Sequence, residues 1–184
     1  MSDLHADALA TLTAWVAPTE QQEALRARFV QHLHDHADGV ERACTPGHLT
    51  AGVLVVDASG EHMLMTLHAK ARRWFHLGGH LEPADATLLA AALREGREES
   101  GLHDLAIDPV PAQLDAHTVP FCAGHAEVEH LDVRYVARAR EGLLPTVSEE
   151  SIDVRWWPID APPEGVEPEL LALARIARER LAGD

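Results

Sequence analysis

Three glutamates lie close together in the stretch "LREGREESGL" at residues 93–102, and their spacing suits the binding of a metal ion. Glu95, Glu98 and Glu99 stand at positions i, i+3 and i+4, so a helix would project all three carboxylates from one face. Each like-charged pair costs such a helix about 0.2–0.5 kcal/mol, and the interior Gly96 costs about 1 kcal/mol relative to alanine. Helix stability therefore does not explain this stretch, whereas clustered carboxylates are the ligands that hard cations such as Mg²⁺ prefer.

The longer stretch from Gly79 to Leu102 resembles the Nudix box, whose pattern is G-x5-E-x7-R-E-U-x-E-E-x-G-U with U an aliphatic residue. The strict matches are Arg94, Glu95, Glu98, Glu99, Gly101 and Leu102. Two positions depart from the pattern: Asp85 stands at the usual glutamate position with one extra residue before Arg94, and Gly96 replaces the aliphatic residue. With its flanking segments the resemblance covers about residues 48–160, and it is to a bacterial subgroup of Nudix hydrolases with this longer box.

This resemblance implies a set of roles for the residues of the box. Glu98 and Glu99 would be the chief ligands of Mg²⁺, with Mn²⁺ as a possible substitute, and Glu95 would be a further ligand or the base that activates water. The Gly78-Gly79 turn would offer a backbone carbonyl to the metal. Arg94 would orient the carboxylates by hydrogen bonds rather than act on the substrate. A cation held in this way neutralises a pyrophosphate and lowers the pKa of a bound water.

A second group of polar residues is a candidate for binding the substrate. The alternation along 129–135 places His130, Asp132 and Arg134 on one face of a strand, either as an ordinary open face or as the lining of the cleft with Arg134 on phosphate. Glu150 lies in the loop before the next strand, where several Nudix subgroups carry an additional acid. Trp74, which precedes the glycine pair, either stacks on a base or belongs to the core.

The remaining histidines and the cysteines give no recognised metal-binding pattern. His32, His34 and His36 lack an acidic or cysteine partner in a known spacing, so we interpret them as structural or surface residues. Cys44 and Cys122 are far apart and are expected to be ordinary small apolar side chains rather than a disulfide or a redox pair. Of Trp156 and Trp157, one is expected to lie in the core.

The composition favours a single domain of moderate size that binds a small ligand. The chain has 184 residues, and 15 basic against 30 acidic residues give a net charge of −15, which argues against tight binding to long nucleic acids. No run of 18 apolar residues occurs, and the N-terminal stretch carries acidic residues where a signal peptide would have basic ones. We therefore expect a cytoplasmic protein with no membrane segment, and the family resemblance adds a possible homodimer.

The pattern of apolar residues predicts an α+β fold, an α/β/α sandwich around a mixed sheet. Residues 1–44 are expected to form an N-terminal helical extension that packs on a Nudix domain at 45–184. The predicted helices cover residues 4–16, 19–37, 86–100 and 167–182, and the predicted strands cover 48–57, 62–69, 74–77, 112–121, 127–139 and 148–160. Gly78-Gly79 is expected to end its strand in a loop, and Gly101 to cap the helix of the box.

Three functions are compatible with these features. The first is Mg²⁺-dependent hydrolysis of the pyrophosphate bond in a nucleoside diphosphate linked to another moiety. The second is an isomerase of the isopentenyl-diphosphate type, which shares the fold but needs a reactive cysteine in a motif that neither "RACTPG" nor "PFCAGH" matches well. The third is a non-catalytic nucleotide-binding module, which would be expected to have lost glutamates that this chain retains.

Overall fold

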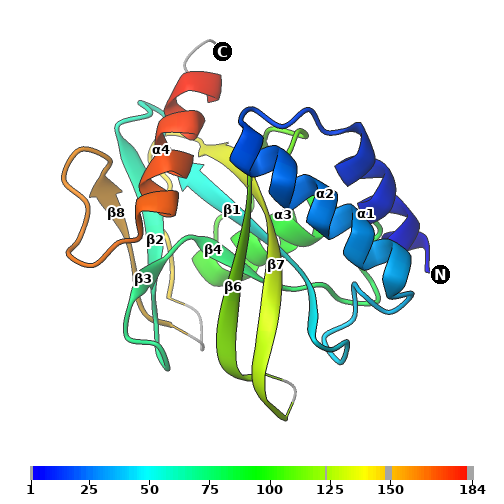
Figure 1. The fold of residues 1–184 in the computed structure, drawn as a ribbon. Coiled ribbons are helices and arrows are strands. Elements are labelled where there is room, and N and C mark those ends of the chain that lie inside the picture. Colours follow the sequence, from blue (N-terminus) through cyan, green and yellow to red (C-terminus); the bar gives the residue numbers. More distant parts are fainter. Residues whose placement is uncertain (1, 123, 148–150, 182–184) are drawn as a thin grey trace.

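Four helices and one eight-stranded sheet form the computed structural model, which describes residues 2–122, 124–147 and 151–181 (Figure 1). The helices are α1 (Asp3–Ala14), α2 (Glu20–Asp35), α3 (Leu88–Ser100) and α4 (Pro168–Leu181). The strands are β1 (Gly47–Val56), β2 (His62–His68), β3 (Trp74–Phe75), β4 (Leu77–His80), β5 (Leu105–Ile107), β6 (Gln113–Cys122), β7 (His125–Ala139) and β8 (Ser151–Pro158). Of the described helices, none is long and apolar enough to cross a membrane.

The sheet is mixed and is built around β1, which is buried along its whole length. β1 pairs in parallel with β7, with His48 opposite His130 and Thr50 opposite Asp132, and it pairs in antiparallel fashion with β2 and β4. β6 and β7 form a long hairpin that extends to the bottom of Figure 1. The continuous apolar run of β1 is thus explained by its place between neighbours in the middle of the sheet.

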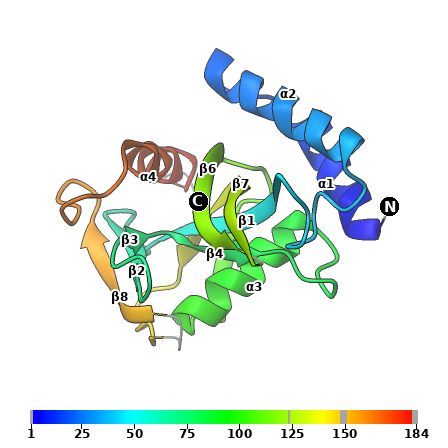
Figure 2. The ribbon, with the colours of Figure 1, turned by 60° about the horizontal axis from the view of Figure 1, so that its bottom comes forward.

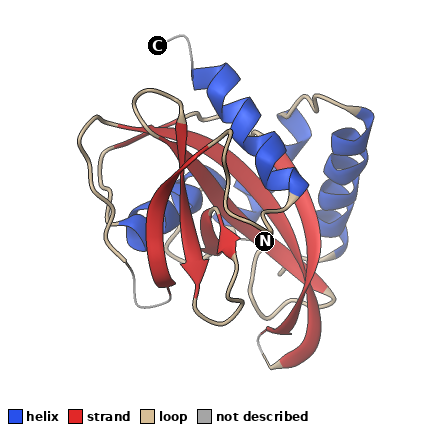
Figure 3. Cartoon of the chain, turned by 90° about the vertical axis from the view of Figure 1, so that its left-hand side faces the viewer, coloured by secondary structure: helices blue, strands red, loops and turns tan. Residues whose placement is uncertain are grey.

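Two apolar clusters cover the two faces of the sheet. The first includes Val53, Val133 and Tyr135 together with the buried side of α3, and the second packs Leu54 and Val136 against α4. α3 and α4 accordingly lie on opposite sides of the twisted sheet (Figures 2 and 3). This arrangement confirms the predicted α+β sandwich with a mixed sheet.

The two N-terminal helices are tied to the rest of the chain by packing and by specific hydrogen bonds. Their apolar side chains, such as Leu12 and Phe29, belong to the same cluster as the buried side of α3. The side-chain amide of Gln22 bonds both backbone groups of Leu114, at 2.9 and 2.7 Å, which completes the outer edge of β6. Trp15 Nε1 donates to the Pro111 carbonyl at 2.8 Å.

The structure corrects two details of the predicted elements. Gly78 and Gly79 do not form a loop, because they pair with Gly52 and Ala51 of β1 as part of β4. Glycine is needed for this close pairing, since a Cβ on Gly78 would lie 2.7 Å from the Gly52 Cα. The short strand β5 was not predicted. Its three residues pair only with the end of β7, and three residues are too few to show a period.

Candidate active site

The helix of the box begins and ends at residues with specific capping geometry. Thr87 Oγ1 accepts a hydrogen bond from the Ala90 N–H at 3.0 Å, and Gly101 ends α3 in the left-handed conformation, with φ 70°. A further carboxylate, Asp7 of α1, accepts from the Leu88 N–H at 2.8 Å. The free N–H groups at the start of α3 therefore have partners from both the helix itself and the N-terminal extension.

Gly96, the residue that departs from the box pattern, lies where α3 approaches the sheet. It is buried, and an added Cβ would lie 2.7 Å from Val53 Cγ1 of β1 and 3.3 Å from Leu105 Cδ1. A larger side chain would push the helix away from the sheet. The glycine therefore costs helix propensity but allows close helix–sheet packing.

Of the three box carboxylates, Glu95 and Glu99 lie against β4, and Glu98 lies at the surface of α3. The Gly78 N–H donates to Glu99 Oε2 at 2.9 Å, and Glu99 is almost fully buried. A Cβ on Gly79 would lie only 2.7 Å from Glu95 Oε1, so the Glu95 carboxylate rests directly on this glycine. Glu98 is open to solvent, with 60% of its side chain exposed. The Gly78-Gly79 pair thus provides the surface against which two of the carboxylates are placed.

Arg94 connects these carboxylates to the segment before the helix. Its guanidinium holds Asp85 with two hydrogen bonds of 3.0 and 2.9 Å, and it also donates to the His80 carbonyl at 3.0 Å. The Nη1 group donates to Glu95 at 2.9 Å and to Glu98 at 3.1 Å. The one cation therefore offsets part of the repulsion between the box carboxylates.

The pairing between Arg94 and Asp85 is reflected in their pKa values. The hydrogen bond to Asp85 raises the pKa of Arg94 above its ordinary value. Burial alone would raise the pKa of Asp85, but the hydrogen bonds from Arg94 and the Glu82 backbone outweigh this effect and lower it below its ordinary value. Asp85 is charged at neutral pH, so the shorter acid at the usual glutamate position still forms a bidentate pair with the arginine.

The box carboxylates suit a cation that keeps part of its water shell. Among the described residues, two groups of three or more possible ligands have their atoms within 4.8 Å of one another, and neither includes a box glutamate. The carboxylates converge without forming a closed cage. Mg²⁺ matches this arrangement, because it is usually held by one or two carboxylates and takes its other oxygens from water and substrate phosphates.

The predicted alternation along β7 is confirmed, but the polar face is largely buried. Arg134 is 4% exposed, and its guanidinium donates to Asp132 at 2.7 Å, Gln113 at 3.0 Å and Asp115 at 2.9 Å. Asp132 also accepts from Thr50 at 3.1 Å. The contact between Arg134 and phosphate stays a prediction, because in this structure all three guanidinium nitrogens are used within the protein.

This buried network has a defined charge state. Burial alone would raise the pKa of Asp132, but Arg134 and His76 hold that pKa well below its ordinary value. His76 lies 3.3 Å from Asp132, and its pKa is lowered, first by burial and then by Arg134. Gln113, which bonds Arg134, also donates to the Glu169 carbonyl at 3.0 Å. The network therefore links the polar face of β6 and β7 to the start of α4.

The tryptophans pack on the core clusters. Trp74 and Trp157 meet edge to face, with ring centroids 5.3 Å apart, and the Arg155 guanidinium lies 5.5 Å from the Trp74 centroid. Trp157 packs on the cluster beneath α4, and Trp156 packs on the cluster beneath α3. Trp74 is half-buried, and its role in stacking stays a prediction. Glu150 lies outside the described residues, so the additional acid predicted there is not placed.

One group of side chains was not foreseen from the sequence. His48, His80, His130 and Cys122 bring their possible ligand atoms within 4.8 Å of one another, and we call them the imidazole–thiol cluster. Burial lowers the pKa of His80 to about 4 and that of His130 to about 3, and neighbouring histidines add to both shifts. The sequence alone carries no signal for this cluster. His48 lies beside His130 because β1 and β7 pair in parallel, and that register is visible only in the structure.

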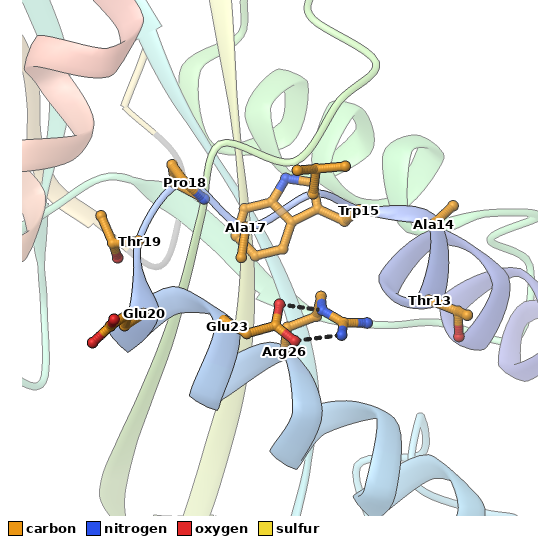
Figure 4. Close-up of a pocket in the computed structure, with 10 residues that line it drawn as sticks. Thr13, Ala14, Trp15, Ala17, Pro18, Thr19, Glu20, Glu23 and Arg26 are labelled. Carbon is orange, nitrogen blue, oxygen red and sulfur yellow. Dashed lines mark hydrogen bonds and ion pairs between the residues drawn. The ribbon is translucent and has the colours of Figure 1, made fainter.

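A hollow of about 610 Å³ lies at the turn between α1 and α2, away from the box (Figure 4). The side chains of Trp15, Glu23 and Arg26 face it, and Arg26 Nε donates to Glu23 at 2.7 Å. The Trp15 indole N–H and this charged pair already have hydrogen-bond partners within the protein. The hollow belongs to the N-terminal extension, and none of the box carboxylates lines it.

Comparisons with known proteins agree with this geometry. A comparison with curated proteins found no match. Similar solved structures include a NUDIX-family hydrolase from Clostridium perfringens, with 22% identity, a TM-score of 0.58, and 73% of this chain and 97% of that chain covered. An Ap4A hydrolase from C. elegans, in a binary complex, has 19% identity and a TM-score of 0.57, with 74% and 98% covered. The NUDIX domain of NrtR from Shewanella oneidensis, complexed with ADP ribose, has 20% identity and a TM-score of 0.51, with 82% and 97% covered.

These structural likenesses show the fold, and the sequence itself shows the family. The NUDIX domain model matches residues 46–176, which include the box and every described strand from β1 to β8. The match begins just before β1 and leaves out α1 and α2. With the fold, the capped box helix and its convergent carboxylates in agreement, this chain belongs to the Nudix hydrolase family.

Proposed function

We propose that this protein hydrolyses the pyrophosphate bond of a nucleoside diphosphate linked to another moiety, with Mg²⁺ as its cofactor. The observation that carries the proposal is the placement of the box carboxylates against Gly78 and Gly79, with Arg94 bonded to two of them. A helix face with three acids is otherwise unfavourable. Here it is fixed by partners on β4 and by Arg94, which Asp85 holds in place.

Glu98 and Glu99 are the proposed holders of the metal. Glu98 is exposed, so it is accessible to a hydrated ion, whereas Glu99 is fixed by its bond to the Gly78 N–H. Since the N–H and C=O of one residue in an antiparallel ladder point to the same side, the Gly78 carbonyl is directed toward this side of β4 as well. When bound, Mg²⁺ would neutralise the pyrophosphate and make a bound water more acidic.

The other residues of the box keep this arrangement in place. Glu95, resting on Gly79, is the proposed acceptor of the proton from the attacking water or a further ligand. Arg94 positions Glu95 and Glu98 while Asp85 holds its guanidinium, so we assign Arg94 to positioning rather than to the substrate. Asp132 and Arg134 form a buried ion pair that maintains the polar face of the sheet.

The substrate class follows from the chemistry and from the family. An Ap4A hydrolase and an ADP-ribose complex are among the structurally similar proteins, and both of these ligands join a nucleoside to another group through phosphates. The net charge of −15 disfavours a long polyanion, but a small one bound through a cation remains compatible with it. We propose a nucleotide-type small molecule as the substrate.

The proposal is tested by chromatographic detection of the two phosphate-ended products that hydrolysis would form. The substrates are nucleoside triphosphates, nucleotide sugars, ADP-ribose, dinucleoside polyphosphates and coenzyme A, each with Mg²⁺ and with Mn²⁺. We expect turnover of at least one substrate, abolished by chelator and restored by Mg²⁺. Glu98→Gln should lower it by orders of magnitude. Glu82→Gln is the matched control, since Glu82 is equally exposed and lies 4.0 Å from the same arginine but outside the helix. Full turnover in excess chelator would overturn the mechanism.

A further inference from the structure

Four strands bring three imidazoles and one thiol together, and one of these residues, His80, lies within the box next to Gly79. His48 lies on β1, His80 on β4, His130 on β7 and Cys122 at the end of β6. Cys122 Sγ is 3.3 Å from His80 Nε2 and 3.8 Å from His48 Nε2. The three imidazole rings have centroids between 5.0 and 5.2 Å apart. Residues so distant in the sequence converge here only because of the way the strands pair.

The hydrogen bonds around the cluster leave ring nitrogens available on its inner side. His48 Nδ1 lies 3.2 Å from the Cys44 carbonyl, which can only accept, so the proton is on Nδ1 and Nε2 keeps its lone pair toward Cys122. His130 Nε2 is buried and has no hydrogen-bond partner within the described part of the chain. A buried polar atom without a partner is unfavourable, and a bound metal would remove this cost.

We propose that His48, His80, His130 and Cys122 bind a zinc-type transition-metal ion. Three imidazole nitrogens and one thiolate form a ligand set typical of tetrahedral Zn²⁺ and unsuited to Mg²⁺, which takes oxygen ligands. Zinc–nitrogen and zinc–sulfur bonds of ordinary length give a tetrahedron with edges of about 3.3–3.6 Å. The contacts of Cys122 with two of the histidines, at 3.3 and 3.8 Å, are close to these edges, and all four ligand atoms lie within 4.8 Å.

This site is separate from the box in its chemistry, and it does not depend on the proposed hydrolysis. Four protein ligands fill a tetrahedral sphere, so the ion would be structural rather than catalytic. It would nevertheless act on the box through β4, because His80 follows Gly79 directly and its carbonyl accepts from Arg94 at 3.0 Å. The ion would hold four strands, including the one on which the Glu95 carboxylate rests.

The test uses the full chain, which is first stripped of metal and then titrated with Co²⁺ alone. Co²⁺ in a tetrahedral site absorbs visible light, and a thiolate ligand adds a sulfur-to-cobalt charge-transfer band. We expect one equivalent to bind with that band, and to be displaced by Zn²⁺ but not by a large excess of Mg²⁺. The thermal midpoint should rise when Zn²⁺ is added. Absence of the thiolate band in the wild type would by itself overturn the proposal.

Two cysteine variants locate the site. Mutation of a residue that only hydrogen-bonds to a metal ligand typically lowers metal affinity about 10- to 100-fold. Cys122→Ser removes a ligand itself, so it should weaken Co²⁺ binding at least about 100-fold and remove the thiolate band. Cys44→Ser is the matched control, because Cys44 is also buried and belongs to a different group with His36 and Asp38. His130→Asn, which keeps the thiol, should weaken binding similarly. Unchanged binding in Cys122→Ser, or loss of the band in Cys44→Ser, would contradict the assignment.

Discussion

The box carboxylates and the imidazole–thiol cluster meet at Gly79 and His80, yet the two groups are built in opposite ways. The carboxylates come from little more than one turn of a single helix, and Arg94 offsets part of their charge. The cluster draws one residue from each of four strands and contains no carboxylate. One group is local in the sequence and partly open to solvent, and the other is assembled by the sheet and largely buried.

The difference between the two groups is a difference in ligand chemistry. Carboxylate oxygens hold a hard, hydrated cation that must also reach a substrate, which requires solvent access. Imidazole and thiolate ligands hold a softer ion that needs neither water nor substrate once four ligands are in place. Two adjacent sites with these properties would keep different metals without exchange between them. Variants in and around the box measure how far it depends on the structure that surrounds it.

The largest expected effect is on turnover when a box carboxylate loses its charge. Glu99→Gln keeps the size of the side chain, and the amide oxygen can still accept from the Gly78 N–H. We expect turnover to fall by about two to three orders of magnitude, because a metal contributes several kcal/mol of charge stabilisation. The thermal midpoint without metal should change little. Steady-state kinetics at saturating Mg²⁺ would show near-normal turnover if Glu99 is only a structural partner of β4.

The box was predictable from the sequence because its determinants are local. The spacing of the glutamates, the capping Gly101 and the strict matches around Arg94 lie within one helix and its ends. The alternation along β7 likewise separated His130, Asp132 and Arg134 from the apolar side chains between them. Periodicity therefore predicts which side chains share a face, and the order of the strands and helices predicts the mixed sheet.

The partners of these residues were not predictable, because they depend on pairing between distant strands. The burial of Arg134 follows from Gln113 and Asp115 on β6, which the register places opposite β7. The sequence predicts an ordinary apolar role for Cys122, because no metal-ligand spacing surrounds it, and its approach to the histidines depends on how the strands pair. The sequence predicts a loop at the paired glycines of β4, because their closeness to β1 is likewise a long-range contact.

The charge of Asp85, which pairs with Arg94, should contribute to the stability of the folded chain. Asp85 has a pKa below its ordinary value in the folded chain, so it contributes stability that is fully present above about pH 4 and is lost as the pH falls through the folded-state value. Asp85→Asn should therefore be less stable than the wild type by about 1.5–3 kcal/mol at pH 7, as expected for hydrogen bonds to a charged group. Urea denaturation should show this gap shrinking below about pH 4. A gap that stays constant down to pH 2 would mean that the pairing with Arg94 does not depend on the charge of Asp85.

A smaller effect is expected where the box helix meets the sheet. Gly96→Ala gains about 1 kcal/mol of helix propensity but forces a methyl group to within 2.7 Å of Val53 Cγ1, and such overpacking costs about 1–3 kcal/mol. We expect net destabilisation of about 1 kcal/mol. In a double-mutant cycle, Val53→Ala should relieve the clash, so that Gly96→Ala becomes neutral or stabilising in that background. Additive effects would show that the close approach of α3 does not select the glycine.

The smallest effect tests whether the box is as local as its sequence suggests. Asp7 reaches from α1 to the N-terminus of α3, where a negative charge stabilises the helix by about 0.3–1 kcal/mol. Asp7→Asn keeps an oxygen acceptor for the Leu88 N–H and removes only the charge. The free energy of unfolding should therefore fall by that amount, and turnover should stay within about twofold.

Asp3→Asn is the control, because Asp3 lies in the first turn of α1 and its loss affects that helix alone. Chemical denaturation in low and high salt separates the two variants. The effect of Asp7→Asn should persist in high salt because Asp7 is half-buried and its partner Leu88 is fully buried, whereas the effect of the exposed Asp3→Asn should be screened. Equal losses for the two variants would place the contribution of Asp7 in its own helix and leave the box independent of the N-terminal extension.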